Sequence, residues 1–102
     1  MAVAWPREKV VTKLKPPYNL VLLDDDDHSD RYVVEMCQAI FGYPPERGMQ
    51  IAQEVHAQKR AIIFSGSLEV AELKQEQVHA YGPDQRIQRC RGSMTAVIEK
   101  AS

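Results

Sequence analysis

The residues best equipped for chemistry lie in one short run, Asp24-Asp25-Asp26-Asp27-His28. Adjacent carboxylates could hold Mg²⁺ or Ca²⁺, because these hard cations take several oxygen ligands. However, successive residues of an extended chain point to opposite sides, so only some of these carboxylates can converge on one point. The run also lacks the glycine-spaced Asp-x-Asp-x-Asp pattern of a calcium loop. We therefore expect no metal and no other cofactor.

Two other roles fit the acidic run. Carboxylates in a solvated turn would stabilise the positive end of a following helix. Alternatively, carboxylates held at the rigid edge of a sheet would accept hydrogen bonds from the cation of a ligand. Acid–base catalysis by paired carboxylates is the least favoured role, because no recognisable nucleophile or oxyanion hole accompanies them. The residues alone leave the first two roles open.

His56 is a second candidate, because it lies beside the apolar side of a predicted helix, just before that helix ends. A single histidine there is usually structural, or complements the negative end of the helix. If the first two helices pack as a hairpin over the first strand, His56 and Asp24 or Asp25 would flank one small apolar hollow.

The whole composition narrows the class of protein. The chain has 102 residues, 44% hydrophobic and 26% charged, which is the usual mixture for one globular domain. A net charge of −1 argues against a nucleic-acid binder that relies on a strong positive field. Cys37 is expected to be a small core residue, so a disulfide scaffold is improbable. With no apolar run of roughly 18 residues and no apolar leader, we expect a cytoplasmic protein with no membrane partner.

The elements that position these residues begin with an apolar run at 18–23, which predicts the first strand. Ser29 suits the start of a helix, and Gly42 suits its left-handed end. Pro44-Pro45 then starts a second helix, since proline fits a first helical turn. One apolar stripe on the first helix consists of Val33, Met36, Cys37, Ile40 and Phe41.

A second strand is expected at 61–64, where β-branched residues cluster. The composition of 65–67 is typical of a turn, and Ser67 would begin the third helix. Gly82-Pro83-Asp84 ends that helix, and alternating apolar residues over 93–99 predict the last strand. The residues of the third helix expected to face the core are Val70, Ala71, Val78 and Tyr81.

This order predicts an α+β fold, a small two-layer β-α-α-β-α-β sandwich whose three-stranded antiparallel sheet packs against three helices. The double proline at 16–17 can enter neither a helix interior nor a central strand, so it marks where the folded part begins. We expect a flexible N-terminal arm at residues 1–17 and a core domain at residues 18–102.

The run Tyr18-Asn19-Leu20-Val21-Leu22-Leu23-Asp24-Asp25-Asp26 resembles the signature strand and turn of ClpS, the adaptor family of AAA+ Clp proteases. The likeness covers about residues 16 to 101. Its further segments are Tyr32-Val33-Val34-Glu35-Met36, Glu54-Val55-His56, Leu68-Glu69-Val70-Ala71-Glu72-Leu73-Lys74 and Met94-Thr95-Ala96-Val97-Ile98-Glu99-Lys100.

The resemblance implies a non-enzymatic adaptor that binds destabilising N-terminal residues (Leu, Phe, Tyr or Trp) of substrate proteins and delivers them to a AAA+ Clp protease. It assigns binding of the free α-amino group to Asp24, Asp25 and His56. It assigns the apolar pocket that takes the first side chain to a wall made of His28, Asp30, Ala52, Val55 and Met94.

The resemblance also implies a partner, the N-terminal domain of a Clp unfoldase of the ClpA or ClpC type, with Glu69 and Lys74 on the docking face. Asp24 replaces the family's usual Asn, Asp30 its frequent Met, and Ala52 a larger wall residue. His28 likewise replaces a small Thr. These departures motivate an alternative hypothesis, a ClpS-like paralogue that docks on the unfoldase and modulates it without binding N-termini.

Overall fold

The computed structural model of the protein describes residues 17–25, 27–87, 90 and 92–101, so nearly all of the predicted arm lies outside the described residues. The elements, in chain order, are β1 (Tyr18–Leu23), α2 (Asp30–Phe41), α3 (Pro45–Gln58), β2 (Arg60–Gly66), α4 (Leu68–His79) and β3 (Thr95–Lys100). This order confirms the predicted β-α-α-β-α-β arrangement and the α+β class.

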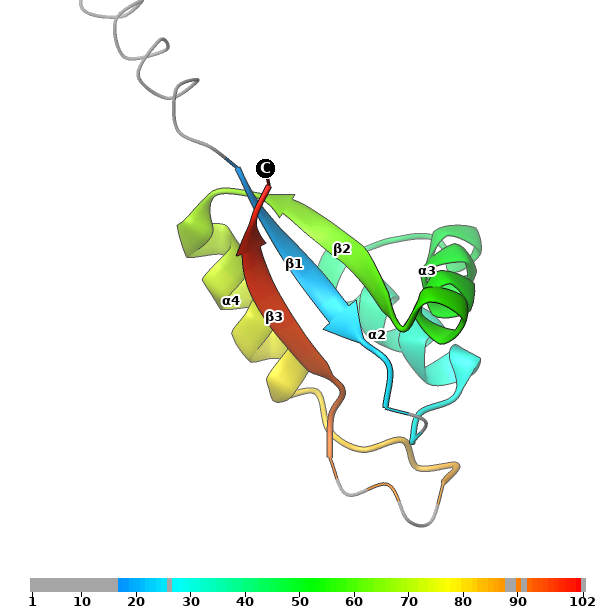
Figure 1. Ribbon diagram of the computed structural model, residues 1–102. Coiled ribbons are helices and arrows are strands. Elements are labelled where there is room, and N and C mark those ends of the chain that lie inside the picture. Colours follow the sequence, from blue (N-terminus) through cyan, green and yellow to red (C-terminus); the bar gives the residue numbers. More distant parts are fainter. Residues whose placement is uncertain (1–16, 26, 88–89, 91, 102) are drawn as a thin grey trace, which may run out of the picture.

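The sheet has the strand order β2-β1-β3, and β1 pairs antiparallel with both neighbours. The first strand of the chain is therefore the central one (Figure 1). Its apolar sequence matches this place, since a central strand has no edge and little access to water. The acidic run leaves β1 at one end of the sheet, where α2 begins.

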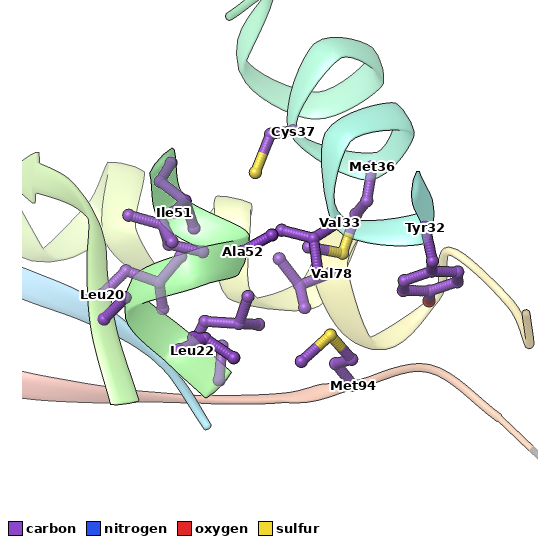
Figure 2. Packing of buried hydrophobic residues seen from close by; sticks show 14 residues of the cluster. Leu20, Leu22, Tyr32, Val33, Met36, Cys37, Ile51, Ala52, Val78 and Met94 are labelled. Carbon is purple, nitrogen blue, oxygen red and sulfur yellow. The ribbon is translucent and has the colours of Figure 1, made fainter. Parts of the chain in front are cut away.

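One hydrophobic cluster joins the sheet to all three helices, so the helices cover a single face of the sheet. Figure 2 shows side chains of α2, α3 and α4 gathered over the strands. The largest fully buried members include Leu20, Leu22, Met36, Ile63 and Met94. Burying side chains of this size contributes roughly 1.5–3 kcal/mol each, which makes this cluster the main source of stability.

The helix ends follow the predicted chemistry. Ser29 Oγ accepts a hydrogen bond from the Tyr32 backbone N–H, and Ser67 does the same for Val70. Gly42 has φ +73°, the left-handed conformation that glycine adopts without strain. α3 begins with proline and ends at Lys59, whose φ is +71°. The boundaries of these helices are therefore determined by the residues at the helix ends themselves.

The structure corrects two predictions. Ser65 and Gly66 belong to β2 and pair with Asn19 and Tyr18, so they do not form the predicted turn. α4 ends at His79, and neither Val70 nor Tyr81 faces the core, since they are 39% and 38% exposed. Among the described residues, no helix has the length and apolar character needed to span a membrane.

Candidate functional site

His56 lies between two carboxylates from different elements. Its Nδ1 is 3.1 Å from Asp24 Oδ1, at the end of β1. Its Nε2 is 2.7 Å from Asp30 Oδ1, on the first residue of α2. The Asp24 side chain is 5% exposed, whereas those of His56 and Asp30 are 34% and 47% exposed. β1, α2 and α3 thus bring three ionisable side chains together, with Asp24 innermost.

The end of α3 fixes this cluster through its backbone. Lys59 closes the helix in the left-handed conformation, and its carbonyl oxygen accepts a hydrogen bond of 3.1 Å from the Asp24 N–H. The Lys59 ammonium lies 3.7 Å from Asp24 Oδ2, but this side chain is 73% exposed. An ion pair so exposed contributes little to stability, so a second cation can compete with Lys59 for Asp24.

Asp25 faces a different histidine. Its Oδ1 lies 2.8 Å from His28 Nδ1 and also accepts a hydrogen bond of 3.0 Å from the Asp27 backbone N–H. The three residues that the resemblance assigns to the α-amino group therefore divide into two neighbouring sets. Asp24 belongs with His56, and Asp25 belongs with His28.

His28 is buried, and both of its ring nitrogens lie near acceptors. Besides Asp25, its Nε2 is 2.7 Å from the Gly92 carbonyl oxygen and 3.2 Å from Cys90 Sγ. Its ring packs against Tyr32 with centroids 4.5 Å apart. The Asp25 carboxylate and the Gly92 carbonyl only accept hydrogen bonds, so each is a suitable partner for an N–H of the His28 ring.

Three residues of the predicted pocket wall lie inside the core. Ala52, Val55 and Met94 are 0%, 0% and 1% exposed, and all belong to the hydrophobic cluster. The other two, His28 and Asp30, lie around them at the sheet end that carries the acidic run. A substrate side chain can contact the inner three only after the residues that cover them move.

Asp84 is a site residue that sequence reasoning did not identify, since it was assigned only to the end of the third helix. Its carboxylate is 0% exposed and accepts hydrogen bonds from the backbone N–H and Oγ of Ser29, at 2.8 and 2.7 Å. It also accepts from the backbone and guanidinium of Arg86. Burial alone would raise the pKa of this carboxyl, but these four hydrogen bonds outweigh burial and lower it to about 2.

Asp84 ties the segment after α4 to the start of α2. Figure 1 shows that yellow-to-orange segment running beside the turn between β1 and α2. Arg86 strengthens the contact by donating to both carboxylate oxygens of Glu35, at 2.9 and 2.8 Å. Tyr32 donates from its hydroxyl to the Gly82 carbonyl at 2.6 Å, and burial raises the pKa of this phenol. Residues 82–86 therefore support the turn between β1 and α2.

The predicted docking residues both lie on α4 but differ in their contacts. Glu69 is exposed in the first turn of the helix. Lys74 donates 2.8 Å to the Ile40 carbonyl and lies 5.6 Å from the centre of the Phe41 ring, so it holds α4 against the end of α2. The exposed apolar residues of α4 are Leu68, Val70 and Leu73.

Within the described part of the chain, no group of three or more His, Cys, Asp or Glu side chains is arranged to hold a metal ion. Asp24 and Asp25 each lie within hydrogen-bond distance of a histidine, and Asp25 also accepts from the backbone N–H of Asp27. The carboxylates at this end of the sheet can accept hydrogen bonds from a ligand, and two imidazoles lie beside them.

The family model described as ATP-dependent Clp protease adaptor protein ClpS matches residues 13–87. The ATP-dependent Clp protease adapter protein ClpS of Pectobacterium carotovorum is 42% identical over 76 residues, and the match covers 72% of each chain. The protein of the same name from Escherichia coli O157:H7 is 40% identical over 76 residues, with the same coverage.

A similar solved structure is that of Agrobacterium tumefaciens ClpS2 bound to L-phenylalaninamide. Its TM-score is 0.71 at 19% sequence identity, over 83% of this chain and 96% of that chain. This likeness bears on the fold, and it agrees with the sheet and helices described above.

Proposed function

This chain belongs to the ClpS family of adaptor proteins for ATP-dependent Clp proteases, and we propose that it binds the N-terminal residue of substrate proteins and delivers them to a Clp unfoldase. The family is one of protease adaptors, so the expected activity is binding. The destabilising residues expected to bind are Leu, Phe, Tyr and Trp. The cytoplasm as the place of action stays a prediction.

The observation that carries the proposal is the position of His56 between Asp24 and Asp30. An α-ammonium group presents N–H donors and one positive charge, and carboxylates are acceptors only. A hydrogen bond to a charged group contributes roughly 1.5–3 kcal/mol when its geometry is good. Asp30 and His56 are open to solvent, so an ammonium can reach them and replace their mutual contact.

The ligand of the structural relative supports this chemistry. L-phenylalaninamide has a free α-amino group and an aromatic side chain, the two features that an N-terminal phenylalanine offers. Burying such a side chain contributes roughly 1.5–3 kcal/mol. Together with hydrogen bonds to the amine, this supports micromolar affinity before the ordering costs are subtracted.

The second half of the proposal is docking of the unfoldase N-terminal domain, of ClpA or ClpC type, on the outer face of α4. We assign Glu69 and Lys74 to this face, together with Leu73, which is 52% exposed. An apolar residue surrounded by charged ones is typical of the centre of a protein interface. Lys74 contributes chiefly by fixing α4, because its ammonium already binds Ile40.

Fluorescence anisotropy of short labelled peptides tests the first half. Peptides that begin with Leu, Phe, Tyr or Trp should bind, and acetylation of the amine should abolish binding. His56→Gln and Asp24→Ala should each weaken binding by about tenfold or more, the value of one charged hydrogen bond. Gln53→Ala, an exposed change on the same helix, is the matched control. Equal binding of free and acetylated peptides would exclude the proposed site.

One observation favours the alternative, a paralogue that docks on the unfoldase without binding N-termini. Ala52, Val55 and Met94 are buried, so three of the five predicted wall residues are not open to the first side chain of a substrate. The alternative predicts that the folded protein binds the unfoldase N-terminal domain but none of the peptides. Amine-dependent binding of any of the four peptides would refute it.

A further inference from the structure

Cys90, His28 and Asp25 form a hydrogen-bonded row beside the proposed amine site. Cys90 Sγ lies 3.2 Å from His28 Nε2, and His28 Nδ1 lies 2.8 Å from Asp25 Oδ1. The residues are 62 and 3 positions apart in sequence, so only the fold brings Cys90 to this pair. A nucleophile, a base and a carboxylate that orients the base are the usual components of an activated side chain.

The Cys90 sulfur lies among several polar groups. The Asp84 backbone N–H donates to Sγ at 3.2 Å, His28 Nε2 lies 3.2 Å from it, and the thiol donates to the Gly92 carbonyl oxygen at 3.3 Å. The thiolate is the reactive form of cysteine, and hydrogen-bond donors or an adjacent imidazolium stabilise it. Cys90 is also only partly buried, so small molecules can reach it.

Cys37 provides the contrast within the same chain. It is 0% exposed in the core, and burial raises the pKa of its thiol to about 11. A buried thiol of this kind is inert toward reagents in water. The two cysteines of the chain should therefore differ strongly in reactivity.

We infer that Cys90 is a site of modification by peroxides, and that its oxidation weakens binding of a substrate N-terminus at the turn between β1 and α2. In this step the thiolate sulfur attacks one oxygen of hydrogen peroxide, an S–O bond forms and the O–O bond breaks. Sulfur gives two electrons to the peroxide and becomes a sulfenic acid. The departing hydroxide takes the Nε2 proton of His28 and leaves as water.

The added oxygen acts on the site through His28. It occupies the space between Sγ, Nε2 and the Gly92 oxygen, where the present contacts are 2.7 to 3.3 Å long. His28 must shift to make room for this oxygen. Asp25 then loses the partner that orients it. The first half of the inference is independent of N-terminal recognition, whereas this second half rests on the proposed function.

The first experiment measures thiol reactivity alone. The folded full-length protein is treated with iodoacetamide, or with hydrogen peroxide followed by the sulfenic-acid probe dimedone, and each cysteine is quantified by mass spectrometry. Cys90 should be modified about tenfold or more faster than Cys37 under both reagents. Equal or slower modification of Cys90 would overturn the inference.

Two variants separate activation by His28 from simple exposure. His28→Asn should slow alkylation of Cys90 by about tenfold. Asp25→Asn, which keeps the side-chain shape, should slow it in the same direction and covers the case in which His28→Asn fails to fold. If a folded variant reacts at the wild-type rate, exposure alone explains the reactivity and the inference is wrong.

The second experiment measures binding of a free-amine Phe peptide before and after peroxide treatment. Affinity should fall about tenfold or more, and dithiothreitol should restore it. Peroxide treatment should not change the peptide affinity of the Cys90→Ser variant. If the untreated protein binds no peptide, the proposed function fails while the reactivity data still decide whether Cys90 is the modification site. Normal affinity of a fully oxidised protein would overturn the coupling to the site.

Discussion

Asp84 keeps a carboxylate charged where water cannot reach it. Four hydrogen bonds compensate the lost hydration, and two of them come from Ser29, the residue that also begins α2. At this scale, single side chains hold the acidic turn in place. Asp84 fixes its Ser29 end, and His28 fixes Asp25. The turn that carries the proposed site therefore depends on partners more than 50 residues away in sequence.

Asp84→Asn should lower the free energy of unfolding by about 2 kcal/mol near pH 7. The pKa is about 2 in the folded protein, below the ordinary value of 3.8. Because the pKa of this carboxyl is lower in the folded protein than in the unfolded chain, its ionised form stabilises the fold at pH values above the unfolded pKa. This stabilisation disappears as the pH falls through the folded pKa. The difference between wild type and variant should therefore shrink between about pH 4 and pH 2.

Urea denaturation followed by circular dichroism at several pH values measures this difference. Glu72→Gln, an exposed change on α4, is the matched control and should have a small effect at every pH. A loss in Asp84→Asn that is the same at low and neutral pH would show that charge is not the cause.

At the scale of elements, the approach of α2 and α3 sets the distance between Asp30 and His56. Gly48 makes this approach possible, since a Cβ there would meet the Val34 Cα at 2.9 Å. The obstacle is backbone, which cannot move aside as a flexible side chain can. Because His56 is on α3 and Asp30 on α2, a shift of one helix changes their contact directly.

Gly48→Ala should destabilise the protein by about 1–3 kcal/mol, although alanine is the better helix former by about 1 kcal/mol. The same variant should bind free-amine peptides more weakly, because α3 carries His56 away from Asp30. Thermal unfolding and anisotropy measure the two effects. Gln53→Ala on α3 controls for helix propensity, and a Gly48→Ala variant as stable as wild type would contradict the close packing.

Local sequence was enough to predict most elements of the fold. The apolar run of β1, the serines that begin α2 and α4, and Gly42 act on their immediate neighbours, so their roles could be inferred without the tertiary structure. Ser65 and Gly66 were misassigned because pairing with β1 outweighs their turn preference. Tyr81 was misassigned because α4 ends before reaching it.

The candidate site could be predicted less completely. The approach of His56 to Asp24 was expected from packing two helices over β1, and the structure places them 3.1 Å apart. The contact of Asp84 with Ser29 spans 55 residues and has no periodic signal. The same holds for Cys90 and His28. Such pairs arise from loop geometry, which a single sequence does not reveal.

At the scale of the whole molecule, the two proposed binding faces lie at opposite edges of the sheet. α3 packs near β2 and carries His56, whereas α4 packs near β3 and carries Leu73. Figure 1 shows these helices on either side of β1. The fold therefore keeps the two proposed faces apart, which would let an adaptor bind both ligands at once.

Leu73→Ser should weaken binding to an unfoldase N-terminal domain by about tenfold or more, since the proposed interface loses its most exposed apolar side chain. Leu73→Ser should leave peptide affinity unchanged. His56→Gln should weaken peptide binding and leave binding to the unfoldase domain unchanged. In the double variant the two losses should add, because distant sites without shared partners are independent. Titrations of both ligands against all variants test this, and an effect of Leu73→Ser on peptide affinity would contradict the separation.

The strand order has a consequence for synthesis on the ribosome. β1 is made first among the described elements, yet it lies in the middle of the sheet, and its neighbour β3 is made last. Between them the chain grows by about 70 residues, which takes several seconds at about 5–20 residues per second. During that interval one edge of an apolar strand stays unpaired and prone to aggregation. A nascent chain halted before Thr95 should therefore depend on chaperones, and release of the last strand should end that dependence.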